Sequence, residues 1–153
     1  MGCCFRPLAL ATDGNLMSSL TSKVVQIFIP SELGYEKIPI AAAAIVATMM
    51  GFSSDQIESL KMAVGEAVTN AIEHGNQLNF NAQVQTILTI QEKQLILDVI
   101  DQGQQPIPDI PTERKDREDN RGWGMLLIKD LVDEVSVEAA SGRNEVRMVI
   151  YLD

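Results

Sequence analysis

The chain has few of the residues that build disulfide-rich, zinc-binding or membrane-spanning proteins. Of its 153 residues only Cys3 and Cys4 are cysteines, and one residue is a histidine. Two adjacent cysteines cannot form a disulfide framework, and a single histidine beside them gives no zinc-ligand set. No apolar run reaches the ~20 residues that a membrane span needs, and the first residues make a poor signal peptide. These absences predict a cytoplasmic protein.

Basic residues are scarce as well, with 12 Lys and Arg against 21 Asp and Glu, a formal net charge of -9. Nucleic-acid binding relies on Lys and Arg that neutralise phosphates, so no direct nucleic-acid contact is expected. The same charge disfavours anionic membrane surfaces. The remaining composition, 46% hydrophobic with 22% charged residues, is typical of a globular domain with a real core.

Hydrophobic periodicity predicts five strands and three helices after a loose N-terminal arm at residues 1–23. The expected strands are 24–30, 83–91, 95–100, 134–140 and 145–152, and the expected helices are 36–50, 53–75 and about 122–132. Two of the strand pairs are joined by short turns and are expected to form antiparallel hairpins. With helices on one face of a mixed, mainly antiparallel sheet, residues 24–153 are expected to form one α+β two-layer sandwich.

The segment SSDQIESLKMAVGEAVTNAIEHG at residues 53–75 carries the clearest helix signals. Ser53 with Gln56 three residues later forms a capping box, and Gly75 supplies a stop. Apolar residues recur at helical spacing and predict one buried stripe, formed by Ile57, Leu60, Val64, Val68 and Ala71. Glu66 falls nearly opposite that stripe on the helical wheel, so it is expected to face away from the core.

Glu66 and Asn70 lie one turn apart on this helix, so their side chains project into the same space. A hard cation such as Mg2+ takes oxygen ligands, often from one or two protein groups together with phosphates. Asn70 offers a neutral carbonyl oxygen to such a cation, and Glu66 is suited to act as a general base. The solvated polar face of an amphipathic helix presents the same pair, so the pair alone leaves both interpretations open.

Two glycine-bearing loops follow the helix. Asp101 ends a hydrophobic strand and precedes Gly103. A carboxylate there accepts a hydrogen bond from an exocyclic amine such as that of adenine, and glycine lets the backbone approach the base. Gly122 and Gly124 flank Trp123 at a helix start, where free N–H groups favour an anion. An Asp-led turn and a plain helix-entry loop give the same two patterns, so neither is specific alone.

The loop between these two motifs is about twenty residues long and has no period, which is typical of a lid or a disordered segment. Its cations are suited to contact phosphates, and they are Arg114, Lys115, Arg117 and Arg121. Neighbouring acidic residues balance most of them, which equally fits solvated surface charge.

Three segments in this order resemble a known family. EAVTNAIEHG at 66–75, LILDVIDQG at 95–103 and RGWGMLLIKDLVDEV at 121–135 resemble the GHKL ATPase superfamily, whose fold is the Bergerat ATP-binding sandwich. Within that superfamily the small single domain is similar to the anti-sigma-factor serine/threonine kinases of the RsbW and SpoIIAB type. The resemblance covers roughly residues 24–152. It implies ATP and Mg2+ as cofactors.

The resemblance also gives each matching position a role. It makes Glu66 the catalytic base and Asn70 the Mg2+ ligand. The positions that would bind ATP together with Asn70 are Asp101 and Gly103 at the adenine and Arg121, Gly122 and Gly124 at the phosphates. The partners that it implies are a STAS-domain antagonist that is phosphorylated, a sigma factor that is sequestered, and a second copy of the chain in a homodimer.

Two positions differ from the pattern that this family usually shows. Gln105 stands where a second glycine is common, and Asn144–Glu145 stands where a glycine and a threonine are common. If Glu145 faces the adenine, nucleotide binding is expected to be weakened. The alternative function is therefore a regulatory module that sequesters a protein partner without phosphorylating it. A third alternative, a detached sensor-kinase domain, lacks a preceding helix with a phospho-acceptor histidine.

Overall fold

A computed structural model describes residues 22–104, 110 and 123–153 of the chain. Its strands are β1 (Lys23–Pro30), β2 (Gln83–Ile90), β3 (Gln94–Asp101), β4 (Glu134–Ala140) and β5 (Arg143–Tyr151). Its helices are α1 (Lys37–Met50), α2 (Ser54–Asn70) and α3 (Trp123–Leu131), and a π-helical turn, η1 (Ala71–Gly75), continues α2. None of these helices is long and apolar enough to cross a membrane.

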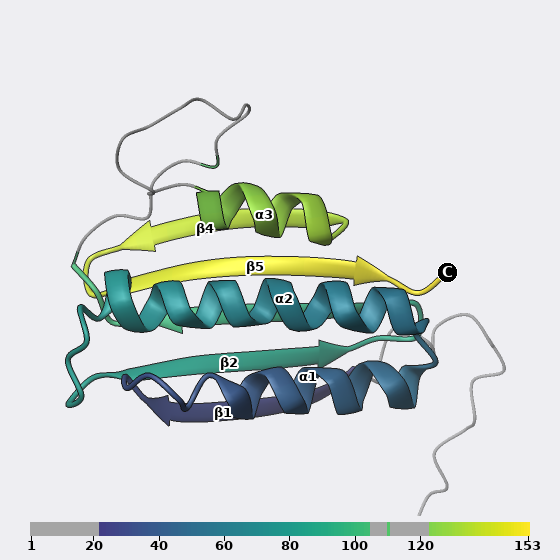
Figure 1. Cartoon of the computed structure of the whole chain (residues 1–153), viewed down its shortest axis with the longest axis horizontal. Coiled ribbons are helices and arrows are strands. Elements are labelled where there is room, and N and C mark those ends of the chain that lie inside the picture. Colours follow the sequence, from purple (N-terminus) through teal and green to yellow (C-terminus); the bar gives the residue numbers. More distant parts are fainter. Residues whose placement is uncertain (1–21, 105–109, 111–122) are drawn as a thin grey trace, which may run out of the picture.

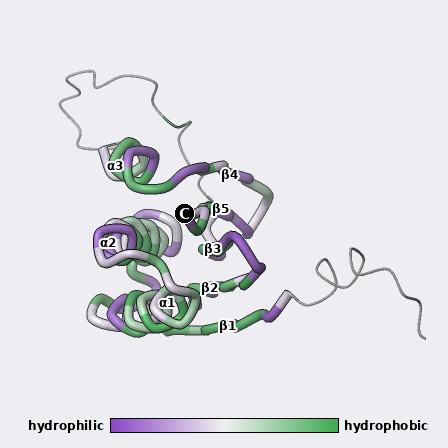
Figure 2. Tube along the Cα trace, turned by 90° about the vertical axis from the view of Figure 1, so that its right-hand side faces the viewer, coloured by the Kyte–Doolittle hydropathy of each residue, from purple (hydrophilic) through white to green (hydrophobic). Residues whose placement is uncertain are grey.

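The described strands form one sheet in the order β1-β2-β3-β5-β4, and every neighbouring pair is antiparallel. The three helices lie side by side over one face of this sheet (Figure 1). Seen along the sheet, helices and strands form two separate layers (Figure 2). The predicted α+β two-layer sandwich with helices on one face is therefore confirmed, whereas the sheet expected to be mixed is antiparallel throughout the described strands.

Helix α2 lies over the middle of the sheet and between α1 and α3 (Figure 1). Its start is the predicted capping box, in which the Ser53 hydroxyl accepts from the Gln56 N–H and the Gln56 side chain accepts from the Ser53 N–H. The predicted apolar stripe packs into the core: Leu60, Val64, Val68 and Ala71 are buried, and Ile57 is partly buried. The polar side of the helix is thereby turned away from the sheet.

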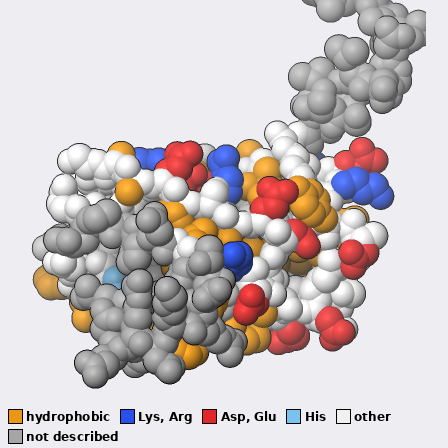
Figure 3. All heavy atoms as spheres, turned by 90° about the horizontal axis from the view of Figure 1, so that it is seen from above, with side chains coloured by type: hydrophobic (Ala, Val, Ile, Leu, Met, Phe, Trp, Pro, Cys, Tyr) orange, Lys and Arg blue, Asp and Glu red, His pale blue; other side chains and the backbone are white. Residues whose placement is uncertain are grey.

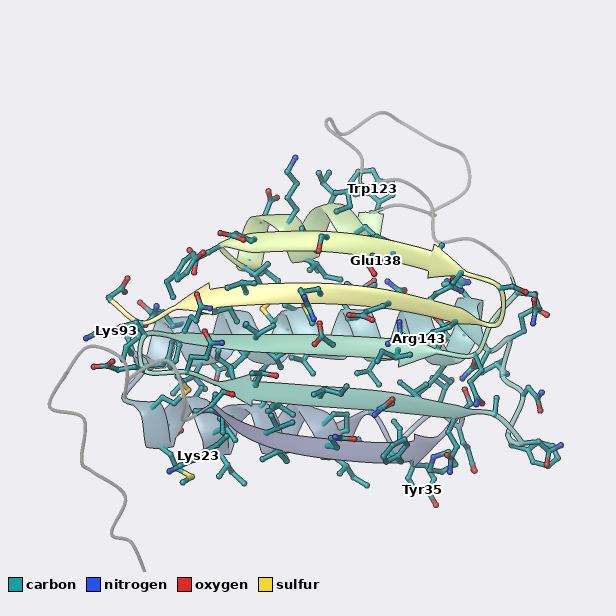
Figure 4. The ribbon with its side chains drawn as sticks, turned by 180° about the vertical axis from the view of Figure 1, so that it is seen from behind. Lys23, Tyr35, Lys93, Trp123, Glu138 and Arg143 are labelled. Carbon is teal, nitrogen blue, oxygen red and sulfur yellow. The ribbon has the colours of Figure 1, made fainter. Side chains whose placement is uncertain are left out.

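Side chains of β3 and β5 alternate between the helix layer and the open face of the sheet. Towards the helices, Leu97 of β3 and Met148 of β5 are register partners and are both fully buried. On the open face, Asp98 pairs with Arg147 in the same register. Arg143 and Glu138 are seen on that face from behind (Figure 4). This alternation decides which residues reach the helix layer.

The element boundaries agree with the prediction to within two residues at each end when η1 is counted as the end of the predicted helix 53–75. Residues 1–21 of the predicted arm lie outside the described residues, as do 105–109 and 111–122 of the predicted long loop. The proposed division into an arm and one domain at 24–153 thus stays a prediction.

At the edge made by α3 and β4, acidic side chains gather around the turn between them (Figure 3). Asp130, Asp133 and Glu134 are the exposed acids there.

Candidate functional site

Asp101 lies at the end of β3, turned toward the helix layer, and only 5% of it is exposed. Its Oδ1 accepts two hydrogen bonds, from the Gly103 N–H at 2.8 Å and from Asn144 Nδ2 at 3.0 Å. Burial raises the pKa of Asp101, and the Gly103 and Asn144 hydrogen bonds partly offset that rise. Among the described residues no hydrogen bond goes to Oδ2, which leaves that oxygen available to a donor on a ligand.

Gly75 and Gly103 pack against Asp101 so closely that a side chain fits at neither position. A Cβ on Gly75 would overlap both carboxylate oxygens of Asp101, and a Cβ on Gly103 would overlap the Gly75 carbonyl oxygen. The sequence predicted Gly75 only as a helix stop. In the structure, glycine is needed at position 75 for this contact as well, because the contact joins the C-terminal end of η1 to the end of β3. We call Asp101, Gly75, Gly103 and Asn144 the β3 corner.

Glu66 and Asn70 lie together on α2, as their spacing predicts, and both are partly buried. The first turn of α3 lies directly against them. A Cβ on Gly124 would overlap Oε1 of Glu66 and would come within 2.9 Å of Asn70 Nδ2. A side chain at position 124 would need the space that Glu66 and Asn70 occupy, so either their side chains or the start of α3 would have to shift. The helix end that favours anions thus lies next to a carboxylate and a carboxamide.

The β3 corner and the Glu66–Asn70 pair lie along the same helix. From Glu66 to Gly75 the chain advances by at most about 13 Å along the axis, at the ~1.5 Å per residue of an α-helix, because the π-helical turn η1 rises less per residue. One end offers a buried carboxylate that can accept from an amine. The other end offers oxygen ligands and a helix N-terminus. This separation is on the scale of an extended nucleoside triphosphate, with the base at one end and the terminal phosphate at the other.

Glu145 does not face the β3 corner, so the condition under which it was expected to weaken nucleotide binding is not met. Asn144, not Glu145, is the β5 residue that faces the corner, where it is 2% exposed and donates to Asp101. Glu145 lies on the open face of the sheet, with its Oε2 at 2.7 Å from Arg143 Nη1. The physical reason is strand alternation. Counting in steps of two from the apolar residues Val146 and Met148 places position 144 inside and 145 outside, which is the signal that could have found Asn144.

The other predicted residues are placed as follows. Gly124 is at the site, whereas Arg121 and Gly122 lie outside the described residues, as do Gln105 and the remaining loop cations. His74 is exposed. The structure thus brings together Glu66, Asn70 and Gly124, and separately Asp101, Gly103 and Asn144.

A divalent cation fits the Glu66–Asn70 end only if a ligand supplies further oxygens. In the described part of the chain no three His, Cys, Asp or Glu side chains gather into a metal-binding group. Mg2+ in phosphate-handling sites characteristically takes one or two protein oxygens and completes its shell with phosphates and water. The closeness of Asn70 and Glu66 to the start of α3 suits that arrangement, because it sets their oxygens beside the helix end that favours an anion.

Comparison with known proteins identifies relatives of the chain. Residues 30–150 match the family model for the histidine kinase-like ATPase domain. Over 138 residues the chain is 35% identical to the serine-protein kinase RsbW of Bacillus velezensis, across 84% of this chain and 86% of that protein. It is 33% identical over 95 residues to the anti-sigma F factor of Clostridium acetobutylicum, across 58% of this chain and 65% of that protein.

A solved structure shows the same fold. The crystal structure of the RsbU and RsbW domains of Rv1364c from Mycobacterium tuberculosis superposes with a TM-score of 0.65 at 18% sequence identity. The superposition covers 85% of this chain and 32% of that longer chain. The likeness supports the two-layer architecture described above.

Proposed function

The chain belongs to the histidine kinase-like ATPase family, and on that premise we propose that it is an ATP- and Mg2+-dependent serine/threonine protein kinase that acts as an anti-sigma factor. The observation that carries the proposal is the contact of Gly124 with Glu66 and Asn70. It sets the anion-favouring end of α3 against a carboxylate and a potential cation ligand. Relatives named serine-protein kinase RsbW support the reaction class.

In the proposed complex the adenine lies at the β3 corner. Its exocyclic amine donates to Oδ2 of Asp101, whose Oδ1 is already held by Gly103 and Asn144. The absence of a side chain at Gly75 and Gly103 lets the end of η1 and the loop after β3 pack against the carboxylate that would hold the base. Arg121 and Gly122 are proposed to contact the phosphates together with Gly124.

The proposed transfer begins with a serine or threonine hydroxyl of the substrate protein. Glu66 takes the hydroxyl proton as that oxygen bonds to the γ-phosphorus, and the bond from the γ-phosphorus to the β–γ bridging oxygen breaks to release ADP. Asn70 would hold Mg2+, which neutralises phosphate charge when bound. The protein contributes mainly position and charge, as phosphoryl transfer requires.

The proposed partners are a STAS-domain antagonist as the phosphorylated substrate and a sigma factor as the sequestered protein. The anti-sigma F factor among the relatives supports the second of these. Both partners imply a cytoplasmic setting.

A homodimer is also proposed. One side of α1 exposes Ile38, Ile45 and Met49, an apolar surface suited to a second copy. Light scattering of the full chain should give a dimer mass, and Ile45→Lys should shift it to the monomer. A monomer mass for the wild type would contradict the dimer.

The non-catalytic alternative loses one of its two supports. Glu145 does not face the β3 corner, so it cannot repel a nucleotide there. Gln105 lies outside the described residues. The kinase is therefore the better supported function, and a sequestering role is compatible with it.

The kinase is tested by incubating the full chain with γ-labelled ATP, Mg2+ and candidate STAS-domain proteins. Label should move to one of them with wild-type protein and not with Glu66→Gln, which should still bind ATP. Glu58→Gln is a matched control, because it removes a carboxylate from the exposed side of the same helix and should transfer normally. Wild-type transfer by Glu66→Gln would remove the proposed base, and no saturable ATP binding by wild type would eliminate the kinase.

A further inference from the structure

A buried asparagine outside the predicted site connects three segments at the β3 corner. Asn76 follows η1 and is 5% exposed. Its Nδ2 donates to the Gln83 carbonyl at 3.0 Å, and its Oδ1 accepts from the Gln102 N–H at 2.8 Å. Gln83 begins β2, and Gln102 directly follows Asp101. One carboxamide thus hydrogen-bonds the backbone at the start of β2 and directly after the end of β3, and it is itself part of the α2–β2 connection.

Gln102 completes a closed ring of hydrogen bonds. Its side-chain Oε1 accepts from the Gln83 N–H at 2.9 Å, while its own N–H donates to Asn76. The Gln102 side chain is on the exposed rim of this ring, and the Asn76 side chain is in the buried part. The Asn76 side chain therefore takes part in two of the three hydrogen bonds of the ring.

The backbone around Asn76 is fixed independently of its side chain. The Asn76 N–H donates to the Ala71 carbonyl at 2.8 Å, which closes the π-helical turn. Gln77 and Leu78 then adopt left-handed φ values of 52° and 58°, which non-glycine residues rarely adopt. The Leu78 N–H donates back to the Ile72 carbonyl at 2.9 Å. Such a conformation persists only where its surroundings hold it. The backbone from which the Asn76 side chain projects is thus held by the bonds to Ala71 and Ile72.

We infer that Asn76 is a positioning residue for the nucleotide base. It fixes the backbone of Gln102, so that Asp101 and Gly103 stay packed against Gly75 at the end of η1. The contacts leave little tolerance, because a single methyl group at Gly75 or Gly103 would overlap its neighbour. Loss of the Asn76 bonds frees Gln102, the residue between Asp101 and Gly103. The N–H of Gly103 is the group that holds Oδ1 of Asp101. This inference rests on the proposed function for its ligand, and on geometry alone for the corner.

A purely structural role would also explain a buried, satisfied asparagine after a helix. That role predicts lower stability with unchanged nucleotide recognition in the folded protein. Positioning predicts a specific loss of adenine affinity and of base selectivity, because Asp101 accepts from the adenine amine and would face a carbonyl oxygen in guanine. The two roles are separated by measurements on folded protein well below its melting temperature.

The test uses Asn76→Ala in the full chain, with Asn76→Ser as a second variant if the first does not fold. ATP binding with Mg2+ is measured by titration calorimetry, and the Kd should rise about tenfold, the effect of losing one hydrogen bond. The Kd for GTP should change less than about threefold, so selectivity for adenine falls. The kcat at saturating ATP should stay close to wild type, because Glu66 and Asn70 are not displaced.

Gln56→Ala is the matched control. Its carboxamide also joins α2 to a strand backbone, donating to the Tyr151 carbonyl at 3.0 Å, but at the opposite end of the helix. It should lower stability without changing either Kd. An unchanged ATP Kd in folded Asn76→Ala, or an equal change in Gln56→Ala, would overturn the positioning role.

A second readout needs no nucleotide. Amide hydrogen exchange at Gln102 and Gly103 should accelerate in Asn76→Ala and not in Gln56→Ala, relative to the exchange of core amides in β3. Unchanged protection at both amides would overturn the inference even if ATP binds. Absence of ATP binding by wild type, with accelerated exchange in the variant, would instead remove the proposed function and keep Asn76 as the residue that orders this corner.

Discussion

Asn144 and Asp101 are register partners across β5 and β3, and Nδ2 of Asn144 donates to Oδ1 of Asp101 at 3.0 Å. The same nitrogen lies 3.4 Å from the Gly103 carbonyl oxygen. Asn144 therefore stabilises the ionised form of a buried carboxylate and holds the loop that follows it. Its neighbour Glu145 has no part in this arrangement, since it pairs with arginines on the opposite face.

We expect Asn144→Leu to weaken ATP binding by about tenfold, because a buried carboxylate loses one of its hydrogen bonds and its charged form becomes costlier. Glu145→Gln should leave the ATP Kd within about threefold of wild type, since its hydrogen-bonding shape is kept on the far face. Calorimetric titration of both variants checks the pair. A larger effect for Glu145→Gln than for Asn144→Leu would contradict the assignment of faces.

Gly124→Ala tests the contact between α3 and the Glu66–Asn70 pair. The added methyl group would overlap Glu66 Oε1, so either the carboxylate or the start of α3 must move. A displacement of about 1 Å at a reacting group costs on the order of 10²-fold in rate. We expect a loss of that order in phosphotransfer to the STAS-domain substrate, measured with labelled ATP.

Gly65→Ala is the control for this effect, one residue before Glu66. There the new methyl group meets only the flexible end of Ile40, with Cδ1 at 3.2 Å. Alanine also favours a helix interior by up to ~1 kcal/mol over glycine. Near wild-type transfer is expected. Equal losses in Gly65→Ala and Gly124→Ala would mean that any methyl group added close to Glu66 lowers transfer, so the Gly124 contact would not be specific.

Asp101→Asn should change both the pH dependence of the unfolding free energy and the affinity for ATP, and the two effects are measured separately. Burial raises the pKa of Asp101, so the folded protein binds its proton more readily than the unfolded chain. Stability therefore falls as pH rises from about 3.8, the ordinary value, through the raised pKa of the folded state. Asn cannot ionise, so the variant should lack this fall. Chemical denaturation between pH 4 and pH 8 should show its unfolding free energy gaining on wild type as pH rises.

The same variant should bind ATP about 10- to 100-fold more weakly, because a charge-assisted hydrogen bond to the adenine amine is replaced by a neutral one or lost. A parallel pH dependence in the two proteins would contradict the burial effect. Unchanged ATP affinity would remove Asp101 from the base site.

The fold was predictable because its signals are local. The Ser53–Gln56 capping box, the apolar stripe of α2 and the alternation in the hairpins each lie within one element, and each is present in the structure. The π-helical turn was not predictable, since residues 53–75 read as one continuous helix. In a π-helical turn each hydrogen bond spans five residues instead of the four of an α-helix. The spacing of apolar residues within a five-residue segment does not distinguish the two.

The site was predictable only in part. Glu66 and Asn70 are neighbours by helical spacing, so the sequence reveals them. The contacts of Gly75 and Gly124 with Asp101 and Glu66 are tertiary, and a glycine in the sequence does not show what it faces. Asn144 was missed because the neighbouring Glu145 carries the more conspicuous charge.

The open face of the sheet should contribute stability and not nucleotide binding. Arg147 holds the buried Asp98 through two bonds, Nε to Oδ1 at 2.6 Å and Nη2 to Oδ2 at 3.2 Å. The Asp98 side chain is 7% exposed, so Arg147→Ala leaves a carboxylate without this partner at a cost of about 1–3 kcal/mol in unfolding free energy.

Urea denaturation should measure that loss. Arg143→Ala should lower the unfolding free energy by less than about 1 kcal/mol, because Arg143 is half-exposed and Glu145 keeps a second contact with Arg147. The ATP Kd of folded Arg147→Ala should equal that of wild type, since its side chain lies on the face away from α2 and the β3 corner. A weakened Kd at full folding would mean that strain on the open face passes through β3 to Asp101, three residues from Asp98 on the same strand.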